Sequence, residues 1–135
     1  MIIELNIGLN VTNGDNSDEF RAHRATTALK ALACGAYTQN ILGSRRAQSG
    51  TEDTLIVKLS VSSGSEQRLR QELFGLSEFL LQDCIAVYNA TGWSGELVGP
   101  NAAAWGEFNP DYFIRFDEAD GPAKIFTKKA ESKVA

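Results

Sequence analysis

The chain opens with a regular alternation of apolar and polar residues between positions 2 and 12. Successive side chains of a β-strand point to opposite faces, so this alternation predicts a strand with one buried and one polar face. The apolar set is Ile3, Leu5, Ile7, Leu9 and Val11. The opposite set contains Glu4, Asn6, Gly8 and Asn10, and it defines a polar sheet face that we expect to be open.

Two later segments carry the spacing of amphipathic helices, and a polar segment with capping residues precedes each of them. The first helix is expected over 18–34, where Gly35 supplies the stop. Its stripe consists of Ala22, Ala25, Leu29, Leu32 and Ala33. The second helix is expected over 66–82, with a leucine stripe of Leu69, Leu73, Leu76 and Leu80. Both helices therefore have one face suited to packing on a sheet.

The remaining strands are predicted from short runs rich in β-branched and aromatic residues. They are expected at 36–48, 54–61, 84–88 and 96–99, with a possible edge strand at 112–116. Their order with the helices matches the split βαβ arrangement. We therefore expect an α+β fold: a ferredoxin-like βαββαβ core with an added C-terminal hairpin or edge strand, and two helices on one face of a mainly antiparallel sheet.

Length and composition indicate one globular unit. The chain has 135 residues, of which 43% are hydrophobic and 22% charged. That length suffices for one core. We expect a single domain over 1–117 and a polar, lysine-containing tail over 118–135. The start lacks a signal-peptide pattern and no apolar run is long enough to span a membrane, which predicts a cytoplasmic protein. Cys34 and Cys84 are expected to be reduced.

Charge and side-chain chemistry exclude several function classes. The formal net charge of −4 disfavours binding to nucleic acid or to an anionic membrane. Only Tyr37 or Tyr88 could offer a stacking ring on the sheet. His23 is the only histidine, nucleophile and phosphate-loop motifs are absent, and the carboxylate spacings do not match a calcium loop. No catalytic residue, metal or cofactor is therefore predicted.

Three surfaces remain as candidate binding sites. The polar sheet face offers Glu4, Asn6, Asn10 and Lys58 for a small polar ligand or a second sheet. The irregular segment 92–116 contains Trp93, Asn101, Trp105 and Phe108, which serve either recognition or packing within this domain. The apolar arc of the second helix is wide enough to cover more than a sheet, and its Phe74 and Leu81 are predicted contacts of a homodimer.

These surfaces support a non-enzymatic binding or protein-interaction domain, which forms a homodimer, as the leading hypothesis. One alternative is a small enzyme that acts on a polar metabolite through carboxylates, which requires two acidic groups such as Glu4 and Glu52 to converge in a pocket. A second alternative is an acidic inhibitor of a basic protein, which requires acidic residues to gather on one face. The residues in question are Asp15, Asp18, Glu52 and Asp53.

Overall fold

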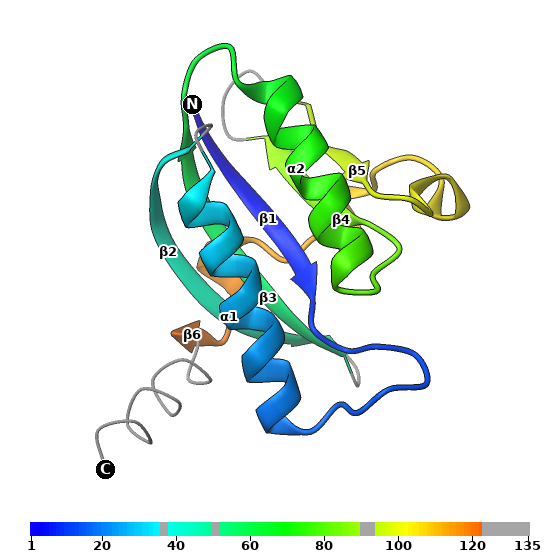
Figure 1. Ribbon diagram of the computed structural model, residues 1–135. Coiled ribbons are helices and arrows are strands. Elements are labelled where there is room, and N and C mark those ends of the chain that lie inside the picture. The colour runs from blue at the N-terminus through cyan, green and yellow to red at the C-terminus, as the bar shows by residue number, and fades with distance from the viewer. Residues whose placement is uncertain (36–37, 50–51, 90–93, 123–135) are drawn as a thin grey trace.

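The computed structural model describes residues 1–35, 38–49, 52–89 and 94–122. Within these ranges the chain forms a six-stranded sheet in the order β5-β4-β1-β3-β2-β6, with every neighbouring pair antiparallel (Figure 1). The strands are β1 (Ile2–Gly8), β2 (Thr38–Ser49), β3 (Glu52–Val61), β4 (Ile85–Asn89), β5 (Glu96–Val98) and β6 (Gly121–Pro122). The helices are α1 (Asp18–Cys34) and α2 (Glu66–Phe79).

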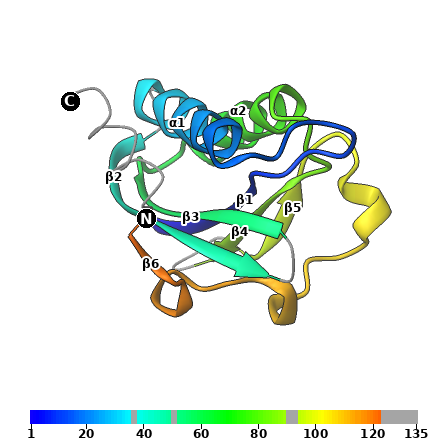
Figure 2. The same ribbon diagram turned by 90° about the horizontal axis from the view of Figure 1, so that it is seen from below.

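Both helices lie side by side on one face of the sheet, as Figures 1 and 2 show. The predicted α+β class and the antiparallel sheet are therefore confirmed. The first helix has the predicted bounds, Asp18–Cys34, and the Oγ of Ser17 accepts a hydrogen bond from the N–H of Phe20 at 3.4 Å. This bond satisfies one of the free amides of the first helical turn.

The core lies between the helices and the sheet, where the apolar alternation of β1 predicts it. Ile3, Leu5 and Ile7 are 0% exposed. They pack with the alanines of α1 and the leucines of α2 in one hydrophobic cluster. Each fully buried Leu or Ile side chain stabilises the fold by about 1.5–3 kcal/mol relative to its exposed state. The small alanine side chains let α1 approach the sheet closely.

The second helix is shorter than the sequence predicts. It ends at Phe79, and Leu81 adopts the left-handed conformation with φ of 58°. The N–H of Gln82 then donates to the carbonyl of Ser77 at 2.9 Å, and the N–H of Leu81 donates to the carbonyl of Glu78 at 3.1 Å. These two bonds form the reversal that terminates many helices. The leucine spacing continues past this point, so periodicity alone cannot locate the end.

The sheet face away from the helices is covered in part by the segment 100–122, shown in yellow and orange in Figure 2. The expectation of an edge strand at 112–116 is wrong. Residues in this region form short 3₁₀ turns, Ala102–Trp105, Pro110–Tyr112 and Phe116–Glu118. The expectation of an open face is also corrected, because the carboxylate of Glu4 accepts a hydrogen bond from the N–H of Phe116 at 2.9 Å.

Aromatic rings fix this covering segment to the sheet. The ring of Phe113 stacks on Tyr88 with 4.9 Å between centroids, and Phe108 lies 5.8 Å from Phe113. Gly43 leaves room for the ring of Phe116, since a Cβ there would lie 2.8 Å from the Cζ of that ring. The chain then rejoins the sheet as β6, which pairs with β2. Ordered structure therefore continues past the predicted boundary at 117, and the rest of the predicted tail, 123–135, lies outside the described residues.

Candidate functional site

A cleft of about 900 Å³ lies on the covered side of the sheet. Its walls come from the end of β1 and the loop after it, the turn between α2 and β4, and residues 105–114 of the covering segment. Asn6 and Gly8 of β1 and Asn10 after it are among the lining residues. The cleft therefore joins parts of the chain that are far apart in sequence.

Gln82 joins the turn after α2 to the loop after β1, because its Nε2 donates to the carbonyl of Asn10 at 2.6 Å. A side chain at Gly8 would meet the end of Gln82, and a Cβ there would lie 2.9 Å from Oε1 of Glu52. Glycine at this position therefore allows both side chains to lie directly on the strand. The arrangement fixes the wall that carries Gln82 and Asp83 relative to β1.

The cleft is acidic. Four exposed carboxylates line it, those of Glu52, Asp83, Glu107 and Asp111, and its described lining contains no lysine, arginine or histidine. No ion pair with a described residue neutralises any of the four. Like charges along one concave surface focus a negative potential, which raises the local concentration of cations. The cleft therefore favours a positively charged ligand.

Aromatic and apolar side chains form the rim of the cleft. The indole Nε1 of Trp105 donates to Oδ2 of Asp83 at 3.0 Å, while the residue remains 64% exposed. Tyr112 is 85% exposed and Leu81 is 74% exposed. All three line the cleft. Aromatic faces beside carboxylates attract ammonium and guanidinium groups through cation–π contacts. We use the name acidic cleft for this site, defined by the four carboxylates, Trp105 and Tyr112.

The structure brings four of the predicted binding residues together. Asn6, Asn10, Trp105 and Phe108 all line the cleft, although the sequence assigned them to two separate surfaces. Asn101 supports it indirectly, because its Nδ2 donates to Oδ1 of Asp83 at 3.3 Å.

Other predicted binding residues lie elsewhere. Glu4 is 5% exposed and holds the covering segment. The Nζ of Lys58 lies 5.6 Å from the ring centroid of Phe116. Trp93 lies outside the described residues. Of the predicted dimer contacts, Phe74 is 42% exposed on α2, and Leu81 is on the rim of the cleft.

Sequence reasoning missed Asp83, Glu107 and Asp111, and it included Tyr112 only among the aromatic residues of the segment 92–116. A signal was present, because carboxylates and aromatic residues alternate closely between 105 and 112.

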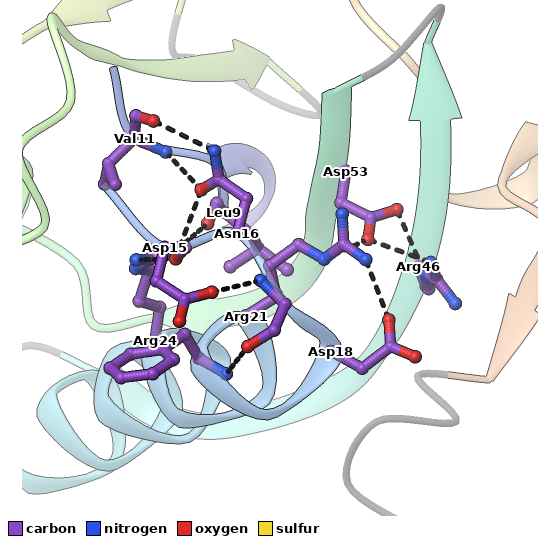
Figure 3. A network of polar contacts seen from close by, with 11 residues as sticks. Leu9, Val11, Asp15, Asn16, Asp18, Arg21, Arg24, Arg46 and Asp53 are labelled. Carbon is purple, nitrogen blue, oxygen red and sulfur yellow. Dashed lines mark hydrogen bonds and ion pairs between the residues drawn. The ribbon is translucent and has the colours of Figure 1, made fainter. Parts of the chain in front are cut away.

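The structure also tests the acidic face that the inhibitor hypothesis requires. Asp53 is 0% exposed and accepts two hydrogen bonds from Arg46, at 3.0 and 2.8 Å (Figure 3). Arg21 pairs with Asp53 at 2.9 Å and with Asp18 at 2.7 Å. The hydrogen bond to Asp53 raises the pKa of Arg46. Asp53 therefore joins α1 to the sheet through Arg21, whereas Asp18 pairs with Arg21 within α1. Because Asp53 is buried, the four acidic residues do not form one continuous acidic face, which weakens the inhibitor hypothesis.

The two carboxylates proposed for an enzyme have different environments. Glu52 lines the cleft, whereas Glu4 is engaged by Phe116 and by Nε of Arg115 at 3.4 Å. Cys84 also lines the cleft, but burial, and next the charge of Asp83, raise the pKa of its thiol. A raised pKa disfavours the thiolate that a cysteine nucleophile needs. The described residues contain no group of three or more histidine, cysteine or acidic residues that could hold a metal ion.

Comparisons with protein families, curated proteins and solved structures give no match to this chain. Within the described ranges, no helix has the length and apolar character needed to cross a membrane. The geometry of the cleft is therefore the basis for assigning a function.

Proposed function

We propose that this protein is a non-enzymatic binding domain whose acidic cleft holds an ammonium or guanidinium group of its ligand. The observation that carries the proposal is the set of four carboxylates with no described cation among the lining residues. An anionic ligand would be repelled by all four carboxylates of the cleft. A positively charged ligand would relieve the repulsion among the carboxylates.

Magnitudes set the expected strength of this binding. An exposed ion pair contributes about 0–1 kcal/mol. An exposed cation–π contact, such as one on Trp105, contributes about 0.5–1 kcal/mol. A single cationic group should therefore bind weakly, and binding should weaken further as salt screens the carboxylates. A tight natural ligand must offer further contacts beside its charge.

The test is a titration followed by nuclear magnetic resonance, with the Trp105 indole N–H as the reporter inside the cleft. N-acetyl-arginine amide is the probe, and N-acetyl-glutamine amide and N-acetyl-glutamate amide are its neutral and anionic controls. We expect saturable shifts of the Trp105 signal with the arginine probe, and smaller shifts with the controls. The double variant Glu107→Gln, Asp111→Asn should weaken arginine binding. Equal binding of the anionic probe would overturn the proposal.

We also propose that the central elements form a ferredoxin-like core. The order β4-β1-β3-β2 of the four central strands supports this assignment, as do the positions of α1 after β1 and α2 after β3. The edge strands β5 and β6 extend the sheet on its two sides, so the complete strand order differs from that of a simple four-stranded sheet.

The cytoplasmic location stays a prediction. The two cysteines, Cys34 and Cys84, are free thiols.

The predicted homodimer is a separate proposal about the outer face of α2. Phe74 and Phe79 are 42% and 73% exposed there, and large apolar side chains in that position gain energy from a second copy. Sedimentation velocity tests it. We expect the wild-type protein to sediment as a dimer and the Phe74→Glu, Phe79→Glu variant as a monomer. A wild-type protein that stays monomeric at high concentration would remove the proposal.

A further inference from the structure

Leu81 occupies a backbone position that disfavours leucine. It is the residue just past the end of α2, and its φ of 58° is in the left-handed region. Glycine, and less often asparagine, normally occupies this position, because a Cβ is strained there. The hydrogen bonds at this reversal come from backbone groups and from the side chains of Ser77 and Gln82. The helix end therefore needs the conformation but not the leucine side chain.

The leucine side chain gains little from packing within this chain. Leu81 is 74% exposed, in contrast to Leu80 beside it, which is 4% exposed in the core. Its side chain instead lines the acidic cleft, as do Trp105 and Asp83, which are joined by a hydrogen bond. Leu81 and Trp105 are thus two exposed side chains with large apolar surfaces in the lining that contains the four carboxylates, and we call them the apolar ledge.

We propose that the ligand of the acidic cleft is a segment of a partner protein, in which an arginine or lysine enters the cleft and a neighbouring apolar side chain packs on the apolar ledge of Leu81 and Trp105. This inference rests on the proposed function, since it names the ligand class of the same site. Charge complementarity selects the basic residue. An aromatic and apolar contact beside it is typical of the energetic centre of protein interfaces.

The shape and surroundings of the site favour a polypeptide over a small amine. A free amine or a polyamine has no large apolar group to cover Leu81, and the cleft of about 900 Å³ is much larger than one cationic head group. A peptide supplies both kinds of side chain at a short, fixed spacing. The leucine at a position suited to glycine is then explained by its contact with the partner.

The experiment compares two peptides on the wild-type protein, acetyl-Leu-Arg-Leu-amide and acetyl-Ser-Arg-Ser-amide, with acetyl-Ser-Gln-Ser-amide as the uncharged control. Affinities are measured from the shift of the Trp105 indole signal. We expect the leucine-flanked peptide to bind about five- to tenfold more tightly than the serine-flanked one, since each partly buried methylene adds a fraction of its transfer free energy.

The matching variants are Leu81→Gly and Leu81→Asn, which suit the left-handed backbone but remove the ledge. Both should reduce the preference for leucine-flanked peptide to within about twofold, while the serine-flanked peptide binds as before. Leu81→Gly should also unfold at a higher temperature than the wild type, because the strain at this position is relieved. The Phe79→Gln variant removes another exposed apolar side chain, which does not line the cleft, and should keep the full preference.

The outcomes separate this inference from the proposed function. If the serine-flanked arginine peptide binds no better than its glutamine control, the proposed function, binding of a cationic group in the acidic cleft, is overturned. If arginine binding is retained but the leucine-flanked peptide gains nothing, or if Leu81→Gly leaves the preference intact, then the cleft binds cations and the protein-partner inference is overturned. A melting temperature that falls in Leu81→Gly would show that Leu81 serves the fold.

Discussion

The side-chain amide of Asn6 makes two hydrogen bonds with the backbone of Ile114: its Nδ2 donates to the carbonyl at 2.9 Å, and its Oδ1 accepts from the N–H at 3.0 Å. Asn6 thereby pairs with the covering segment as a neighbouring strand would. The same residue lines the cleft. One side chain on β1 therefore fixes the position of the acidic loop that precedes Ile114.

Replacing Asn6 should loosen the covering segment. In Asn6→Ala both hydrogen bonds are lost and the backbone groups of Ile114, which is half-buried, lose their partner. We expect the free energy of unfolding to fall by about 1–3 kcal/mol, and arginine binding in the cleft to weaken. Urea denaturation measures the first effect. The control Asn40→Ala replaces an exposed residue of β2 and should change stability by less than about 0.5 kcal/mol. Equal effects of the two variants would contradict the structural role of Asn6.

The local pattern of the sequence predicts the helix side of the sheet well. Alternation on β1 identifies Ile3, Leu5 and Ile7 as buried, which follows from the side-chain period. The capping residues before α1 and Gly35 after it give this helix its observed bounds. Each is decided by residues within one element, so no knowledge of distant contacts is needed.

The other side of the sheet depends on contacts between distant residues. The run Tyr112–Phe116 has the composition of a strand, but Asn6 and Glu4 hold it in another conformation across the sheet face. Trp105 and Asn10 were each predicted as binding residues, yet only the folded chain places them in one cleft. The left-handed Leu81 carries no glycine or asparagine signal. Local propensity therefore could not locate this site.

The buried carboxylate of Asp53 should contribute more to stability than the exposed one of Asp18. Both pair with Arg21, but the side chain of Asp53 is 0% exposed and that of Asp18 is 68% exposed. Removing one partner of a fully buried pair costs about 3–5 kcal/mol. The effect of Asp53→Asn should lie at or below the lower end of that range, since Arg21 and Arg46 keep part of their hydration.

Asp18→Asn is the matched control, with an expected loss of about 0–1 kcal/mol. Urea denaturation of both variants at neutral pH gives the comparison. A loss in Asp53→Asn as small as that in Asp18→Asn would mean that the network in Figure 3 does not stabilise the junction of α1 and the sheet.

Two glycines should respond to alanine in opposite directions. At Gly99 a Cβ would lie 2.5 Å from the carbonyl oxygen of Asp83 and from the Cα of Cys84, both backbone atoms that cannot move alone. Gly99→Ala should therefore lower the free energy of unfolding by about 1–3 kcal/mol. Gly75 is exposed within α2 and a Cβ there meets nothing within 4 Å. Gly75→Ala should raise it by about 0.5–1 kcal/mol. A loss of stability in Gly75→Ala would show that this face of α2 is already covered.

The thiol of Cys84 should make stability depend on pH in the alkaline range. Burial, followed by the charge of Asp83, raises its pKa above the ordinary value of 9.0. Between that value and the higher pKa of the folded state, the folded protein binds more protons than the unfolded chain. The free energy of unfolding must then fall as pH rises through this interval, and the contribution is constant at lower pH.

Urea denaturation at about pH 8 and about pH 10 measures this dependence. Other groups also titrate there, so the quantity of interest is the difference between the wild type and Cys84→Ala, with Cys34→Ala as the control for an exposed thiol. We expect Cys84→Ala to lose less stability than the wild type over this interval, and Cys34→Ala to follow the wild type. Because Cys34 is exposed while Cys84 is partly buried and its raised pKa disfavours the thiolate, iodoacetamide should also modify Cys34 before Cys84. Parallel pH profiles together with equal alkylation rates would mean that Cys84 is as solvated as Cys34 and that its wall of the cleft is open.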